Sequence, residues 1–294
     1  MPRAQCNGVE LEYEVMGSGE PLLLVMGLGA QLVQWPDGFC ERLVERGYMV
    51  IRFDNRDIGL SSWLDHLGVP NVRSVVVRGY AGLPVSSAYT LSDMSDDAVA
   101  LMDALGLDDA HVVGASMGGM IAQTMAIERP SRVRSLVSIM SSPGNRRYSI
   151  AKPHALKALL EPPAKGREAQ IESMVEKFRV FNGAKLPFNE AVAREIMTRA
   201  YDRGFHPAGF ARQLNAIIAS GARREQLRAV RCPTTVIHGT DDALVPPGGG
   251  AATARAIPNA RLQWVDGMGH SLPVVCWGII VDAIDDNCRR VVSP

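Results

Sequence analysis

The chain has 294 residues, of which 47% are hydrophobic and 21% are charged, as is usual for soluble globular proteins. A chain of this length can bury a core that folds without disulfides or metals. Its 31 Lys and Arg residues balance 31 Asp and Glu residues. Overall charge therefore gives no reason to expect a nucleic acid or an anionic membrane surface as a partner.

The cysteines are odd in number, widely spaced and without a C-x-x-C pair: Cys6, Cys40, Cys232, Cys276 and Cys288. This pattern argues against a disulfide framework or a zinc site and favours reduced thiols. No apolar signal segment follows Met1, and the apolar run Pro21–Met26 is shorter than the roughly 20 residues that span a bilayer. We expect a cytoplasmic protein with no membrane span.

Strand and helix patterns alternate from the N-terminus. Val9–Val15 alternates apolar and charged residues, which predicts a half-buried strand near a sheet edge. The continuous apolar runs Leu22–Met26 and Met49–Phe53 predict strands buried on both faces. Between them, Pro36–Gly47 has the spacing of an amphipathic helix that ends at its glycine.

The alternation continues to about residue 144. Thr90-Leu-Ser-Asp93 resembles a capping box and predicts a helix that runs to Leu105. Short strands are predicted at Val112–Val113 and Val133–Met140, with a helix at Met117–Glu128 between them.

Residues 145–220 show no strong strand and instead predict helices at Lys165–Phe181, Asn189–Tyr201 and Pro207–Ser220. Strands and helices then alternate again, at Thr234–His238, Gly249–Ile257, Leu262–Val265 and Val274–Cys288. Repeated strand–helix order predicts a mostly parallel sheet, of the eight-stranded type, with helices on both faces. We expect an α/β core of residues 1–144 and 221–294, with residues 145–220 inserted as a helical cap.

The most specific motif is Gly114-Ala115-Ser116-Met117-Gly118, a G-x-S-x-G segment between a predicted strand and a predicted helix. A serine on such a tight turn has a strained backbone and needs small neighbours on both sides. Its hydroxyl then projects above the sheet, and the following helix directs its N-terminus at the reacting centre. We predict that Ser116 is a nucleophile.

A serine hydroxyl needs a base to take its proton. In α/β-hydrolases the nucleophile is followed along the chain by an acid and then by the histidine. His154 and His206 lie in the predicted cap, and no acid-bearing strand precedes His238. His270, in a glycine-rich loop after a strand, is therefore the predicted base.

The acid is expected at the end of the strand before that loop, where Asp241 and Asp242 stand side by side. The usual spacing places it three residues after the glycine and four before the proline, which favours Asp242. Asp241 is the alternative, and its expected role is that of a turn residue. The acid orients the imidazole without taking the proton itself.

An oxyanion hole needs two donors directed at the developing charge. One is expected from the backbone N–H of Met117, directly after the nucleophile, and the other from the loop after Leu22–Met26. Within that loop the sequence favours the Leu28 N–H.

Several segments together resemble the carboxylesterases of the α/β-hydrolase superfamily, in the branch that contains the aclacinomycin methylesterases: VMGLGAQLVQWP, FDNRDIGLS, GASMGGMIAQ, HGTDDALVP and GMGHSLP. The resemblance implies hydrolysis of carboxylic esters through an acyl-enzyme on Ser116, with no cofactor and no metal. It also implies that residues 54–57 are chiefly structural. Many relatives begin the oxyanion loop with His-Gly, whereas this chain has Met26-Gly27.

The same three residues serve other reactions, so a cofactor-free perhydrolase or haloperoxidase and a carbon–carbon bond hydrolase stay open as alternatives. A non-catalytic ligand-binding protein of this fold is disfavoured, because such proteins often lack one of the three residues. The expected partner is a small-molecule ester, and the sequence predicts no oligomeric state. The substrate pocket is expected between Ser116 and the cap, lined by Gly27, Trp35, Phe178, Phe181 and Phe210.

Overall fold

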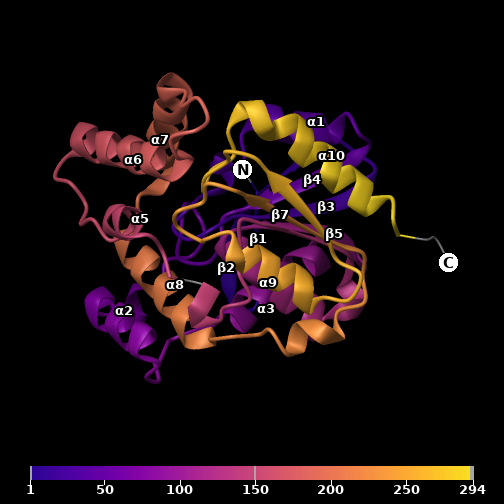
Figure 1. The fold of residues 1–294 in the computed structure, drawn as a ribbon, viewed down its shortest axis with the longest axis horizontal. Coiled ribbons are helices and arrows are strands. Elements are labelled where there is room, and N and C mark those ends of the chain that lie inside the picture. Colours follow the sequence, from indigo (N-terminus) through magenta and orange to yellow (C-terminus); the bar gives the residue numbers. More distant parts are fainter. Residues whose placement is uncertain (1, 149, 292–294) are drawn as a thin grey trace.

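The computed structural model describes residues 2–148 and 150–291. Across these residues, eight strands form one sheet in the order β1-β2-β4-β3-β5-β6-β7-β8 (Figure 1). The β1–β2 and β2–β4 pairs are antiparallel, and all pairs from β4 to β8 are parallel. The strands are β1 Arg3–Cys6, β2 Val9–Met16, β3 Glu20–Val25, β4 Tyr48–Phe53, β5 Ala110–Ala115, β6 Val133–Ile139, β7 Thr234–Gly239 and β8 Arg261–Val265.

Helices cover both faces of the sheet, as the strand–helix order predicts. On one face α1 and α10 pack together, and on the other lie α3, α4 and α9 (Figure 1). The helices are α1 Asp37–Val44, α2 Val72–Ala81, α3 Leu91–Ala104, α4 Met117–Glu128, α5 Pro153–Leu159, α6 Arg167–Asn182, α7 Glu190–Gly204, α8 Pro207–Ser220, α9 Gly248–Ala256 and α10 Trp277–Cys288. In the ranges that the structure describes, none of these helices has the length and apolarity to span a bilayer.

Helices α5 to α8 follow one another between β6 and β7. In Figure 1 they lie beside the sheet together with α2, which comes from the connection between β4 and α3. The α2 helix packs against α8, so residues far apart in the sequence form one helical layer. This layer faces the ends of the parallel strands, where ligands of open α/β sheets bind.

The structure confirms the predicted α/β-hydrolase fold and departs from the sequence-based elements at a few short segments. Thr90 forms the predicted capping box with Asp93. Three elements were not predicted: β1, α2 and α5. Two of them are short, since β1 has four residues at the sheet edge and α5 has seven. The third, α2, contains four valines, whose branched side chains lower helix propensity and so weaken the sequence signal.

Candidate active site

Ser116 lies on a strained turn between β5 and α4. Its backbone has φ 56° and ψ −119°, a conformation that non-glycine residues seldom adopt. The two glycines of the motif make this turn feasible. A Cβ atom on Gly114 would lie 2.1 Å from the Gly118 carbonyl oxygen, and one on Gly118 would lie 2.0 Å from the Val25 carbonyl oxygen. Both positions therefore exclude any larger residue.

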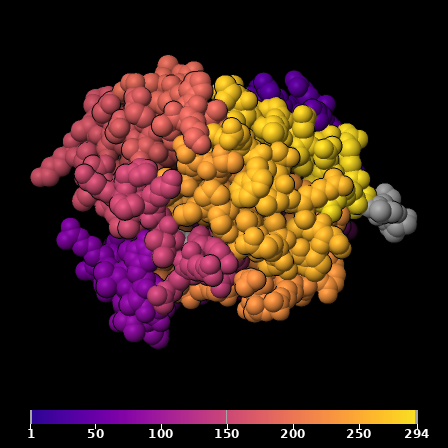
Figure 2. Space-filling view, viewed as in Figure 1, coloured from indigo at the N-terminus to yellow at the C-terminus, as the bar shows by residue number. Residues whose placement is uncertain are grey.

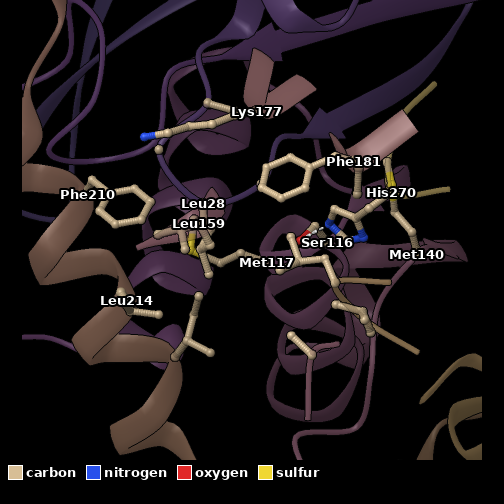
Figure 3. Close-up of a pocket in the computed structure, with 18 of the residues that line it drawn as sticks. Leu28, Ser116, Met117, Met140, Leu159, Lys177, Phe181, Phe210, Leu214 and His270 are labelled. Atoms are coloured by element: carbon tan, nitrogen blue, oxygen red, sulfur yellow. Dashed lines mark hydrogen bonds between the residues drawn. The ribbon is translucent and has the colours of Figure 1, made fainter. Parts of the chain in front are cut away.

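His270 joins Ser116 to Asp242. The His270 Nε2 atom lies 2.9 Å from Ser116 Oγ, and its Nδ1 atom lies 2.7 Å from Asp242 Oδ2 (Figure 3). Because Nδ1 faces a carboxylate, it carries the proton, which leaves Nε2 free to accept one from the serine hydroxyl. Ser116 follows β5, Asp242 follows β7 and His270 follows β8, so three parallel strands bring the three groups together at one edge.

Asp242 is fully buried and held on both oxygens. The Leu244 and Val245 amides donate to its Oδ1 at 2.9 Å and 2.8 Å, while Oδ2 faces His270. Burial by itself would raise the pKa of Asp242, but the charge of His270 and hydrogen bonds from His238 and His270 lower it well below its ordinary range. This carboxylate therefore stays ionised.

The choice between the two neighbouring aspartates is clear from the geometry. The Asp241 Oδ1 atom lies 3.9 Å from the Lys185 ammonium. The Asp241 amide donates to the Met268 carbonyl at 3.0 Å, which ties the end of β7 to the loop after β8. Asp242 is the residue that contacts His270, whereas Asp241 has the expected turn role.

The loop after β3 lies directly against the serine. A Cβ atom on Gly27 would lie 3.1 Å from the Ser116 Cβ atom, so the Gly27–Leu28 backbone passes next to the nucleophile. This position follows from the strand register, since Val25 pairs with Gly114. The backbone amides of Leu28 and of Met117, the first residue of α4, are thus both near Ser116.

Two buried side chains hold this loop in place. The Gln213 side chain, from α8, accepts a hydrogen bond from the Gly29 amide at 2.9 Å and donates to the Arg56 carbonyl at 2.8 Å. On the other side, Asn55 Nδ2 donates to the Met26 carbonyl at 3.0 Å. The segment after β4 therefore supports the loop after β3, which is the structural role that the sequence resemblance implies. Helix α8 supports the same loop through Gln213.

A cavity of about 1720 Å³ lies between Ser116 and helices α2 and α5 to α8, well above the roughly 300–1,000 Å³ of most ligand pockets. Figure 3 shows Phe181 and Met117 beside the Ser116–His270 pair, with Phe210 across the cavity from them. The predicted pocket residues Gly27, Phe178, Phe181 and Phe210 all line it. Further methionine and phenylalanine residues contribute to the wall: Met26, Met120, Met140, Met174, Met197, Phe188 and Phe205.

Trp35 is the exception, and its assignment to the pocket is wrong. Its ring is fully buried in the core between the sheet and α1, where it stacks on Phe39 with ring centroids 5.7 Å apart. The chain itself stays beside the cavity, since Gln34 and Pro36 line it, but the Trp35 side chain lies in the core. Apolarity and closeness in sequence to the oxyanion loop did not reveal that orientation.

Sequence reasoning also missed His238 as a neighbour of the site. Its Nε2 atom lies 2.8 Å from the Val245 carbonyl oxygen and 3.4 Å from Asp242 Oδ2, so this nitrogen carries the proton. The side chain is fully buried at the end of β7. His238 is four residues before Asp242 in a strand-to-turn segment, and only the fold of that turn brings the two together.

The chain is similar in sequence to known hydrolases. Rhodomycin D methylesterase from Streptomyces peucetius is 29% identical over 98% of this chain and 99% of that protein. A putative carbamate hydrolase from Azorhizobium caulinodans is 30% identical over 99% of both. The methylesterase match is the one that the sequence resemblance predicts.

Solved structures of the same fold include a meta-cleavage product hydrolase from Pseudomonas fluorescens, with a TM-score of 0.77 and 20% identity over 99% of this chain and 98% of that one. A thermophilic esterase from Thermogutta terrifontis has a TM-score of 0.71 and 24% identity over the full length of both. The alpha/beta hydrolase fold family matches residues 20–275. The chain therefore belongs to the α/β-hydrolase fold family.

Proposed function

We propose that the protein is a serine carboxylesterase that hydrolyses small-molecule esters through an acyl-enzyme on Ser116. The observation that carries this proposal is the continuous hydrogen-bonded chain from Ser116 through His270 to a buried Asp242, at the base of a large apolar cavity. This arrangement matches the requirements for an activated nucleophile with an oriented base.

In the proposed first step, His270 Nε2 takes the proton of Ser116 as Oγ attacks the ester carbonyl. The imidazolium that forms is stabilised by Asp242, which remains a carboxylate. His270 then protonates the leaving alcohol, and an acyl group stays on Ser116. A water molecule, activated by the same histidine, releases the acid and restores the serine.

We propose that the Leu28 and Met117 amides bind the oxyanion that forms in both steps. The loop that carries Leu28 is fixed by Gln213 and Asn55, and Met117 begins a helix whose N-terminus favours negative charge. We assign residues 145–220 to a cap over a core of residues 1–144 and 221–294. In this assignment α5 to α8 determine which esters reach Ser116.

Relatives with this fold carry out several reactions, so the test must separate them. Their names include methylesterase, putative carbamate hydrolase, 2-hydroxymuconate semialdehyde hydrolase and putative non-heme bromoperoxidase. The methylesterases support ester hydrolysis here, and a cavity of this volume fits a bulky ester.

The decisive experiment follows hydrolysis of p-nitrophenyl esters, from acetate to palmitate, and of methyl esters of bulky aromatic acids. We expect turnover that Ser116→Ala reduces by about 10⁶-fold. Ser92→Ala serves as the matched control. The Ser92 hydroxyl donates a hydrogen bond to Glu128, at the end of α4 that is distant from Ser116, so its loss should leave turnover unchanged. Mass spectrometry during turnover should detect an acyl adduct on Ser116.

Full activity in Ser116→Ala would refute the proposal. An absent ester response, together with peroxide-dependent halogenation or cleavage of a vinylogous diketone, would replace it with one of the two alternative reactions. Binding of esters without turnover in the unaltered protein would instead indicate a non-catalytic ligand-binding role.

A further inference from the structure

The charged residues that line the cavity are nearly all positive. Among the described residues, the cations in its wall are Arg73, Arg146, Lys157 and Lys177. Glu161 is the one carboxylate among the described residues of the wall. The chain as a whole has equal numbers of acidic and basic residues. The positive charge at the cavity is therefore a local property that the overall composition conceals.

Three of these cations have no ionic partner. Arg73 on α2, Arg146 in the turn after β6 and Lys157 on α5 form no salt bridge or side-chain hydrogen bond within residues 2–148 and 150–291. Other arginines are paired, as the buried Arg56 is with Asp97 and the buried Arg212 with Asp57.

The three unpaired cations are exposed and mark the outer edge of the cavity. In Figure 2 the purple α2 segment and the pink segment around α5 border one another, and the surface is indented between them. The Arg146 guanidinium lies against Gly82, at the end of α2, so it bridges the turn after β6 and this helix. Charges placed around an opening attract ions of opposite sign before they bind.

Lys177, on α6, lies further inside. Figure 3 shows its side chain in the cavity, apart from the Ser116–His270 pair and with Phe181 between them in this view. Its side chain is 19% exposed, and its ammonium donates to the Glu161 carbonyl oxygen at 3.0 Å. The Glu161 carboxylate lies 4.0 Å away, so the other two hydrogens of the ammonium lack a close acceptor among the described residues.

Burial lowers the pKa of Lys177, and the nearby Glu161 charge only partly opposes this effect. A cation that is desolvated in this way gains from an anion delivered by a ligand. The rest of the cavity wall is mostly apolar and includes the methionines and phenylalanines named above, which suits a flexible or bulky hydrocarbon body.

We propose, building on the esterase function proposed above, that the enzyme prefers amphiphilic esters that carry an anionic group, such as a carboxylate, remote from the ester bond. The ester reaches Ser116, the apolar body fills the cavity, and the anionic end lies toward Lys177 and the outer ring of Arg73, Arg146 and Lys157. A cationic group at the same end is disfavoured.

Three esters with equal chains test this preference: monomethyl sebacate, methyl decanoate and the methyl ester of ω-aminodecanoic acid. We expect kcat/KM to be highest for the sebacate and lowest for the amino ester. The difference should lie mainly in KM, which should be lowest for the sebacate. Added salt should reduce the difference, because the outer cations are exposed and screened. Equal kcat/KM values for the three esters, or a preference for the amino ester, would overturn the inference.

The triple variant Arg73→Gln/Lys157→Gln/Lys177→Gln should reduce the preference for sebacate over decanoate by about 10-fold, as expected for a few partly exposed charges. Lys165→Gln is the matched control, since it removes one charge from the same helical layer outside the cavity wall. An unchanged preference in the triple variant, or an equal loss in the control, would count against these residues.

A binding measurement keeps this inference separate from the esterase proposal. Calorimetry with Ser116→Ala should show tighter binding of monomethyl sebacate than of methyl decanoate, and the triple substitution should remove the difference. If the unaltered protein hydrolyses no ester but the sebacate still binds more tightly, only the esterase proposal fails. If methyl decanoate is hydrolysed but the two esters bind equally, only the anion preference fails.

Discussion

Asp242 illustrates how much a single buried carboxylate depends on its neighbours. Two backbone amides hold one oxygen, and His270 and His238 face the other. The result is an acid that stays charged and fixes which nitrogen of His270 carries the proton.

Asp242→Asn should lower kcat by about 10⁴-fold, because an amide would stabilise the tautomer of His270 that cannot accept the serine proton. Steady-state kinetics with a p-nitrophenyl ester would measure this. Asp241→Asn is the control, since that side chain faces Lys185 and should leave kcat near the unaltered value. A large loss in Asp241→Asn with little in Asp242→Asn would reverse the assignment.

Activity should fall as the pH is lowered, and a single protonation should account for the fall. His270 must be neutral to act as the base, whereas the lowered pKa of Asp242 keeps that carboxylate ionised after His270 is protonated. A profile of log kcat/KM against pH should therefore decline with the slope of one proton. A two-proton slope, or constant activity far into the acid range, would contradict this reading.

At the scale of elements, the turn between β5 and α4 depends on close contact with β3. Gly118→Ala would place its Cβ atom 2.0 Å from the Val25 carbonyl oxygen, so the strand or the helix must shift. We expect a loss of about 1–3 kcal/mol in the free energy of unfolding, together with reduced kcat.

Urea denaturation would measure that loss. Gly278→Ala on α10 is the matched control, because a Cβ atom there meets no neighbour and alanine favours a helix. It should be neutral or stabilising by up to about 1 kcal/mol. If the Gly118→Ala protein were as stable as the Gly278→Ala protein, the structure would accommodate the added methyl group at the turn with little loss in the free energy of unfolding.

The contact between α8 and the oxyanion loop is a second test at this scale. Gln213→Leu removes the acceptor for the Gly29 amide and the donor for the Arg56 carbonyl. Both hydrogen bonds help to hold the oxyanion loop in place. We expect kcat to fall by about 10-fold or more, with KM less affected, because unmet buried polar groups loosen the loop. A rise in KM with unchanged kcat would instead assign Gln213 to substrate binding.

At the scale of the whole molecule, buried ion pairs join α7 and α8 to the segment after β4. Arg212 contacts both oxygens of Asp57 at 2.9 Å and 2.7 Å, and Arg203 lies 3.0 Å from Asp54. Asp57 also accepts a hydrogen bond from the Tyr89 hydroxyl at 2.8 Å. These contacts fix the helical layer over Ser116.

Arg212→Met should destabilise the protein by about 3–5 kcal/mol, because it leaves the Asp57 carboxylate buried without its cation. Urea denaturation measures the change. Arg167→Met, which breaks an exposed pair with Asp202, is the control and should change stability little. Equal stability of the two variants would show that the buried pair adds nothing beyond an exposed one.

Much of the core and of the nucleophile turn follows from local sequence. The elbow at Ser116 is specified by glycines whose spacing is a direct requirement of the backbone, and continuous apolar runs identify strands buried on both faces. The capping box at Thr90 is equally local. Such features can be read because much of their physical cause lies in neighbouring residues, although Gly118 is also required by its contact with Val25 on β3.

Other features arise only where distant segments meet. Trp35 enters the core, α2 joins the helical layer, His238 approaches Asp242 and Gln213 supports the oxyanion loop because of packing between elements far apart in sequence. The positive charge of the cavity has the same origin, since the outer ring comes from α2, a turn and α5, and Lys177 comes from α6. The sequence by itself determined the α/β class and the serine turn, because the patterns that specify them lie within short segments of the chain. The tertiary structure alone decided the cavity and its charge, because these depend on which surfaces the folded chain brings face to face.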